Sequence, residues 1–201
     1  MQLFSMPSSG NSYKVRLLLA LLGRTVPITD VEAKTDALAQ AKAEGRLPFG
    51  KAPVLILDDG TALAESNAIL HHLGQGTRFI PVDPVSQAQM LSWMFWEQNT
   101  HEGVIAVRSA LLCYPHRRAQ ATPERLADLL EAGIAILQIM ETHLSGRDWL
   151  VGTAPSLADL SLYAYTHSAE TRGGFDLSRF PAICAWLARV EELPGYVGLD
   201  D

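Results

Sequence analysis

The chain has 201 residues, of which 48% are hydrophobic and 19% charged, and it carries a formal net charge of -6 at pH 7. This length and composition are typical of a globular protein that folds without metals or disulfides, and they exclude intrinsic disorder. Apolar runs such as 17–22 are far shorter than the roughly 20 residues of a membrane span. Because no basic block exceeds Arg117-Arg118 and no signal-like segment opens the chain, we expect a cytoplasmic protein that binds neither nucleic acid nor membranes.

The first 80 residues alternate short apolar segments with helical ones. Apolar spacing and turn residues predict strands at 2–5, 26–30, 54–57 and 62–64, and helices at 12–23, 36–43 and 66–74. The sequence Asp58-Asp59-Gly60 indicates a hairpin turn, because glycine readily takes a positive φ. The resulting order βαβαββα implies a mixed four-stranded sheet with helices on its faces.

From Pro84 onward the pattern is helical throughout. Helices are predicted at 85–112, at 123–144 with Thr122 as N-cap, from Ser156 onward, and at 180–191. The third of these begins with a capping box in which Asp159 replaces the usual Glu. Residues 77–84 form the linker between the α/β and the all-α regions. The two cysteines are expected to be free and buried.

Four stretches together carry a family resemblance, namely 7–16 (PSSGNSYKVR), 50–55 (GKAPVL), 63–69 (LAESNAI) and 152–159 (GTAPSLAD). In this order and at these spacings, the chain resembles the bacterial cytosolic glutathione transferases over essentially its whole length. The resemblance implies a thioredoxin-like glutathione-binding domain at 1–78, followed by an all-helical domain at 85–201 that contributes an electrophile pocket. It also implies a homodimer and glutathione as co-substrate.

The resemblance assigns the glutathione-binding residues. It implies a cis Ala52-Pro53 bond that presents the backbone of Ala52 to the cysteinyl part of glutathione, while Lys51 reaches the glycyl carboxylate. Ser66 and the helix N-terminus would hold the γ-glutamyl carboxylate, since unpaired N–H groups there favour an anion, and Glu65 would face the ammonium group. Taken singly, Glu65-Ser66 indicates only an ordinary helix start, and Lys51 is more typical of a solvated lysine.

Ser9 is the first candidate for the catalytic hydroxyl, because it matches the position used by serine-type members of the family. A hydroxyl that donates to the glutathione thiolate lowers the thiol pKa. Asn11 is the alternative, since it coincides with the asparagine of a disulfide-reducing group of the family. Ser8 and Ser12 lie close by, and each also suits a helix cap. The sequence departs from the tyrosine-type and cysteine-type groups.

The electrophile pocket has weaker signals. Its candidates lie on the long helix and the chain after it, with His101, Arg108, Leu112 and Tyr114 foremost and Val104, Leu111 and Tyr196 beside them. No histidine pair has metal-ligand spacing, because His71 and His72 are adjacent on a helix and diverge, so no metal is expected.

Three functions remain open on the sequence. The first is a glutathione transferase that conjugates the activated thiolate to small hydrophobic electrophiles. The second is a glutathione-dependent disulfide or peroxide reductase, which a role of Asn11 at the sulfur would favour. The third is a non-catalytic binding or interaction protein on the same fold, because a fold alone does not fix a function.

Overall fold

The computed structural model describes residues 1–200 and divides the chain into two compact units. The first unit comprises Met1–Ile80 together with the C-terminal residues from Leu193, and the second comprises Pro81–Glu192. The chain therefore leaves the first unit, forms the second, and returns to the first at its end.

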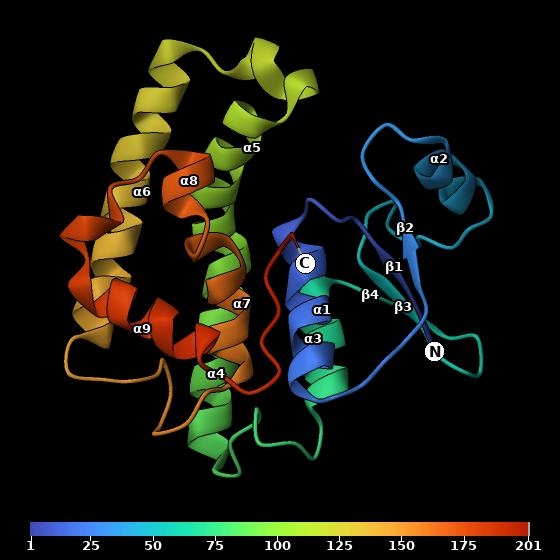
Figure 1. The fold of residues 1–201 in the computed structure, drawn as a ribbon, viewed down its shortest axis with the longest axis horizontal. Coiled ribbons are helices and arrows are strands. Elements are labelled where there is room, and N and C mark those ends of the chain that lie inside the picture. The colour runs from blue at the N-terminus through green and yellow to red at the C-terminus, as the bar shows by residue number, and fades with distance from the viewer. Residues whose placement is uncertain (201) are drawn as a thin grey trace. The chain divides into compact units, whose positions relative to one another are not determined.

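The first unit contains the expected mixed sheet and three helices (Figure 1). The strands β1 (Gln2–Ser5), β2 (Ile28–Asp30), β3 (Val54–Ile56) and β4 (Ala62–Ala64) stand in the order β2-β1-β3-β4, and only the β1–β2 pair is parallel. The helices are α1 (Gly10–Leu21), α2 (Asp36–Ala43) and α3 (Ser66–Gly74). The order βαβαββα is that of a thioredoxin-like domain and confirms the sequence-based fold class.

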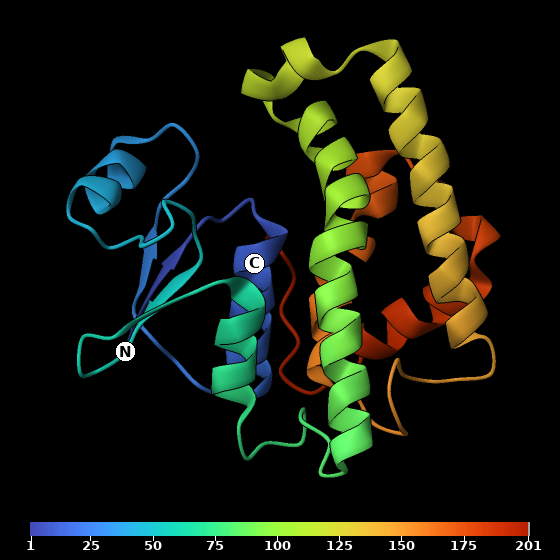
Figure 2. The same ribbon diagram turned by 180° about the vertical axis from the view of Figure 1, so that it is seen from behind.

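The sheet separates two apolar layers, because successive side chains of a strand point to opposite faces. Phe4 and Val54 form a buried cluster with Ala41 of α2 on one face. Their neighbours Leu3 and Leu55, both 0% exposed, therefore face the opposite layer. Figures 1 and 2 show α1 and α3 side by side on that second face, with α2 across the sheet from them.

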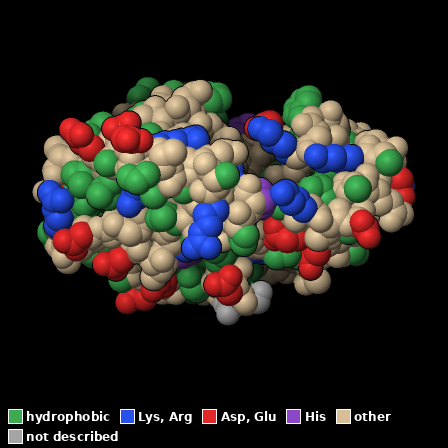
Figure 3. All heavy atoms as spheres, turned by 90° about the horizontal axis from the view of Figure 1, so that it is seen from above, with side chains coloured by type: hydrophobic (Ala, Val, Ile, Leu, Met, Phe, Trp, Pro, Cys, Tyr) green, Lys and Arg blue, Asp and Glu red, His purple; other side chains and the backbone are tan. Residues whose placement is uncertain are grey.

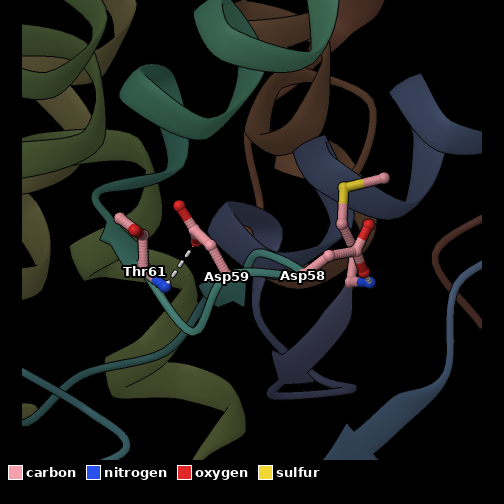
Figure 4. A network of polar contacts seen from close by, with 4 residues as sticks. Asp58, Asp59 and Thr61 are labelled. Atoms are coloured by element: carbon pink, nitrogen blue, oxygen red, sulfur yellow. Dashed lines mark hydrogen bonds and ion pairs between the residues drawn. The ribbon is translucent and has the colours of Figure 1, made fainter.

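The predicted hairpin turn joins β3 to β4 and is shown in Figure 4. Gly60 adopts a φ of 87°, which a residue with a side chain rarely takes. Asp59 Oδ1 accepts a hydrogen bond from the Thr61 N–H at 2.8 Å, and the N-terminal ammonium pairs with Asp58. The turn therefore fixes the register of the hairpin through its own side chains.

The second unit is all-helical, as expected. Its elements are α4 (Pro84–Trp96), a π-helical segment (Glu97–Ala106), α5 (Val107–Cys113), a 3₁₀ segment (Pro115–Gln120), α6 (Pro123–Leu144), α7 (Leu157–Thr166), α8 (Ala169–Gly173), a 3₁₀ turn (Leu177–Arg179) and α9 (Pro181–Glu191). Thr122 caps α6 by accepting from the Arg125 N–H at 3.2 Å. The single helix predicted at 85–112 is in fact interrupted by the π-helical segment.

The core of this unit forms around α7, nine of whose ten residues are buried. The predicted capping box is present at its start. Asp159 Oδ2 accepts from the Ser156 N–H at 2.8 Å and the Ser156 hydroxyl at 2.9 Å, while Oδ1 accepts from Leu150 N and Trp186 Nε1. Burial raises the pKa of the Asp159 carboxyl, and these hydrogen bonds act in the opposite direction.

Two expectations about the second half of the chain need correction. Residues 193–200 belong to the first unit and not to a domain spanning 85–201, because side chains of α1 bind their backbone carbonyls. The cysteines are free, as expected, but exposed rather than buried. Cys113 is the last residue of α5, where the apolar stripe ends, and Cys184 lies on the solvent-facing side of α9.

Within residues 1–200, no helix has the length and apolar character to cross a membrane. Acidic and basic side chains are interspersed on the face of the molecule shown in Figure 3.

Candidate functional site

The sheet register brings three of the four family-like stretches to one edge. Phe4 pairs with Val54, which in turn pairs with Ala64. The loop after β1, the residues before β3 and the residues after β4 therefore leave the sheet at the same end. This edge gathers the Met6–Ser9 loop, Lys51-Ala52-Pro53 and Glu65-Ser66 within the first unit.

Ser9 occupies the N-cap position immediately before α1, but its side chain does not cap the helix. Its φ of -91° and ψ of 127° are those of an N-cap residue, yet its side chain makes no capping hydrogen bond. Its backbone is fixed, since Ser9 N donates to Met6 O at 3.0 Å and Ser9 O accepts from Tyr13 N at 2.9 Å. A serine at an N-cap ordinarily bonds the helix start. The half-buried Ser9 hydroxyl is therefore held in place by the backbone and not consumed by the helix.

Ser12 has a different role. Its side chain is 0% exposed, and its Oγ accepts from the Met6 N–H at 2.9 Å. This bond closes the loop between β1 and α1 from the inside. Among the serine hydroxyls near the start of α1, the Ser12 hydroxyl is therefore already hydrogen-bonded to the loop.

Asn11 lies one residue into α1 and meets the start of α3. The Ser66 hydroxyl, on a residue only 3% exposed, donates to Asn11 Oδ1 at 3.0 Å. The structure therefore places the alternative catalytic side chain beside the residue expected to bind the γ-glutamyl carboxylate.

Glu65 precedes α3 in a strained conformation, with a φ of 68° and a ψ of 118°. A residue with a side chain held at positive φ costs on the order of 1–3 kcal/mol, and such residues cluster at functional sites. The strain directs the chain from β4 straight into α3, whose unpaired N–H groups then begin at the buried Ser66.

The Ala52-Pro53 peptide bond is cis, as the family resemblance implies. Pro53 is buried against the start of β3, Ala52 is half-buried and Lys51 is exposed. The Lys51 ammonium is thus free to meet an anion from solvent.

The four foremost electrophile candidates lie in the second unit, in two kinds of environment, whereas Tyr196 belongs to the first unit. His101 is 0% exposed, with Nε2 3.0 Å from Thr166 Oγ1. Arg108 donates to the carbonyls of Gly173 and Leu126, so its guanidinium joins helices of this unit. Leu112, at 45% exposure, and the half-buried Tyr114 retain accessible surface.

Sequence reasoning missed two residues that hold the Met6–Ser9 loop. Glu32 accepts from the Ser8 N–H at 3.1 Å, and Arg16 donates to the Pro7 carbonyl at 3.0 Å. One signal was present for Arg16, which is a cation immediately before the apolar run 17–22 and two helical turns after Ser9. The structure shows no cluster of three or more metal-ligating side chains among residues 1–200.

The fold and this edge define a protein with a thioredoxin-like domain followed by an all-helical domain. Residues 3–77 match the family model of the glutathione S-transferase N-terminal domain, and residues 104–194 match that of the C-terminal domain. The chain belongs to the glutathione S-transferase family.

Solved structures agree with this assignment. A glutathione S-transferase from Pseudomonas fluorescens is 41% identical, with a TM-score of 0.93 over 100% of this chain and 98% of that one. Another from Xanthobacter autotrophicus is also 41% identical, with a TM-score of 0.90 over 98% and 96% of the two chains. The disulfide-bond oxidoreductase YfcG of Escherichia coli is 28% identical over 73% of this chain and 70% of its own length.

Proposed function

We propose that this protein is a serine-type glutathione transferase, which activates the glutathione thiol for attack on small hydrophobic electrophiles. The observation that carries the proposal is the Ser9 hydroxyl, which sits at the helix start without capping it. Relatives of the same family that share 41% of its residues are named glutathione S-transferases.

Glutathione would bind along the edge of the sheet by its two charged ends. The buried Ser66 and the N-terminus of α3 suit the γ-glutamyl carboxylate, and Glu65 suits the ammonium group. The Ala52 backbone would take the cysteinyl part, and the exposed Lys51 would take the glycyl carboxylate. The cysteinyl sulfur would then face the Ser9 hydroxyl.

The gain from lowering the thiol pKa is limited. A drop of about two units raises the thiolate fraction at pH 7 from ~3% to ~75%. Lower basicity also reduces nucleophilicity, which leaves a net gain of about three-fold. Most of the acceleration must therefore come from holding the electrophile beside the sulfur. Among the candidates, Leu112 and Tyr114 have surface to offer an electrophile, whereas His101 and Arg108 already serve the interior of the helical unit.

The test is an ultraviolet difference titration of bound glutathione against pH. The wild type should show thiolate absorbance well below the pKa of the free thiol, and Ser9→Ala should move that midpoint upward. Ser8→Ala, which removes the adjacent hydroxyl, is the matched control and should leave the midpoint unchanged. Saturable binding without any shift in the wild type would reject thiol activation by Ser9.

A disulfide or peroxide reductase is the second candidate. The contact between Asn11 and Ser66, and the similarity to the disulfide-bond oxidoreductase, favour it. If Asn11→Ala abolishes glutathione-dependent disulfide reduction while Ser9→Ala leaves all turnover intact, the reductase replaces the transferase. If glutathione does not bind at all, a non-catalytic interaction protein is the better conclusion.

The proposed homodimer is tested separately. Light scattering of the purified protein should give twice the chain mass of 21.9 kDa. A monomer at micromolar concentration would reject it.

A further inference from the structure

The Arg16 guanidinium joins three segments of the first unit. Its Nη1 donates to the Ser5 hydroxyl at the end of β1 at 2.9 Å. Its Nη2 donates both to the Pro7 carbonyl in the loop before Ser9 and to the Leu199 carbonyl in the C-terminal tail, each at 3.0 Å. A planar fork of donors can serve several acceptors at once, which a lysine ammonium at the same place cannot reproduce.

The tail is fixed to α1 at two further points. The Tyr13 hydroxyl donates to the Val197 carbonyl at 2.8 Å. Gly195 has a φ of 88°, and a Cβ there would lie 2.8 Å from the Ala20 carbonyl oxygen, so only glycine lets the tail cross the helix this closely. Figures 1 and 2 show the tail running along α1.

Side chains of α1, together with Glu32, hold the backbone of the loop before Ser9. Ser12 and Glu32 bind the amides of Met6 and Ser8, and Arg16 binds the carbonyl of Pro7. Of these three, the Arg16 contact is the one that also reaches the C-terminal tail. The Arg16 side chain therefore joins the tail to Pro7, two residues before Ser9.

The guanidinium lies partly buried beside acidic groups. Burial lowers the pKa of Arg16, while Asp30, Tyr13 and Asp200 act in the opposite direction. Arg16, Asp30 and Asp200 also line a pocket of about 500 Å³ with Pro7, Ser8, Ile28, Glu32 and Leu199. A small cation from solvent can therefore reach the position of the guanidinium.

We infer that the C-terminal tail acts, through Arg16, as a strap that holds the Pro7–Ser9 loop in its active position. The inference deepens the proposed function and rests on it for the effect on turnover. Arg16 is a positioning residue, because it acts on the backbone that carries Ser9. Tyr13 and Arg16 bind the tail through its backbone carbonyls. In this proposal the tail supports the thiol-activating loop indirectly, through Arg16, and not by binding glutathione.

The first experiment measures hydrogen exchange of the peptide covering residues 5–12 by mass spectrometry. Arg16→Ala and Tyr13→Phe should each accelerate its exchange, since both release the tail. The matched control is Arg24→Ala, which removes a guanidinium that donates to the Leu73 carbonyl at 3.2 Å elsewhere in the first unit. This control should leave the peptide unchanged. If the hydrogen exchange of this peptide is unchanged in folded Arg16→Ala protein, the strap inference is overturned, whatever the enzymatic activity of the variant.

The second experiment measures turnover with glutathione and a chromogenic aryl halide. Arg16→Ala should lower kcat about ten-fold and leave the KM for glutathione within about two-fold, because the loop is misplaced while the binding edge is intact. The pH midpoint of the bound thiol should rise. Millimolar guanidinium should restore part of kcat to Arg16→Ala, and Arg16→Lys should remain impaired.

The results separate this inference from the proposed function. A wild type without glutathione-dependent turnover rejects the transferase, while the exchange experiment still decides whether the tail orders the loop. An accelerated exchange combined with unchanged kcat and thiol midpoint would overturn the positioning role of Arg16.

Discussion

Ser9 and Ser12 lie three residues apart on the same helix start, but they serve different ends. The Ser12 hydroxyl is buried and bound to the Met6 amide, whereas the Ser9 side chain makes no capping bond. A serine that forgoes its cap gives up about 1 kcal/mol of helix stability. The missing capping bond leaves the Ser9 hydroxyl available to a ligand, whereas the Ser12 hydroxyl is already bonded. A functional role of Ser9, as proposed, requires such an available hydroxyl.

This contrast predicts opposite effects of two alanine substitutions. Ser12→Ala leaves the partly buried Met6 N–H without its acceptor and should lower the free energy of unfolding by about 1–3 kcal/mol. Ser9→Ala should change it by less than about 0.5 kcal/mol, because no capping bond is lost. Urea denaturation of both variants measures the difference. Equal destabilisation would show that Ser9 is a structural cap.

Among the secondary structure elements, the capping box of α7 couples stability to pH. Burial raises the pKa of Asp159, so the folded chain binds that proton more tightly than the unfolded chain does. The free energy of unfolding therefore falls as pH rises from the unfolded value of about 3.9 through the folded pKa. The Ser156 hydroxyl donates to the charged carboxylate and limits this fall.

Loss of that donor raises the Asp159 pKa further. Ser156→Ala should therefore cost about 1 kcal/mol near pH 4 and more at pH 7, with unchanged glutathione affinity in the folded protein. The control is Ser178→Ala, whose hydroxyl donates to the exposed Asp176, and it should lose little stability at either pH. Denaturant titrations at the two pH values decide the matter. A cost that shrinks toward neutral pH would contradict the coupling.

Local sequence patterns predicted most elements, but not those that depend on distant contacts. The bounds 36–43, 62–64, 66–74 and 123–144 agree with the structure, because caps, turns and apolar periodicity mark them. The π-helical segment Glu97–Ala106 escaped prediction, since its apolar spacing still resembles a helix and its buried polar side chains meet partners on α7. Five residues of α8 are too few to show a period.

The site shows the same limit. The cis proline and the Glu65-Ser66 helix start have local motifs that point to them, and the structure places both at one edge of the sheet. The binding of the tail by Tyr13 and Arg16 has no such motif, because the partners are backbone carbonyls more than 180 positions away. A carbonyl looks the same in every residue, so only the fold can show which one is used.

At the scale of the whole molecule, the helical unit is an insertion between two parts of the first unit, because the chain returns to the first unit from Leu193. The proposed glutathione site therefore lies in a unit that contains residues from both ends of the chain. A ligand that binds only the folded state stabilises it by mass action, by about 2.7 kcal/mol at 100 times its Kd. For a chain of this size that corresponds to a rise in Tm of about 5–10 °C.

Glutathione at this excess should therefore raise the Tm of the wild type. The Ser66→Ala variant should lose most of this rise, because the buried Ser66 hydroxyl faces the proposed γ-glutamyl site and orders Asn11. Ser86→Ala is the control, since its hydroxyl bonds Asp83 at the start of α4 in the helical unit. It should keep the full rise. Differential scanning calorimetry with and without glutathione measures all three proteins. A wild type whose Tm does not respond to glutathione would remove the basis for the binding edge, and a full response in Ser66→Ala would move the γ-glutamyl end away from α3.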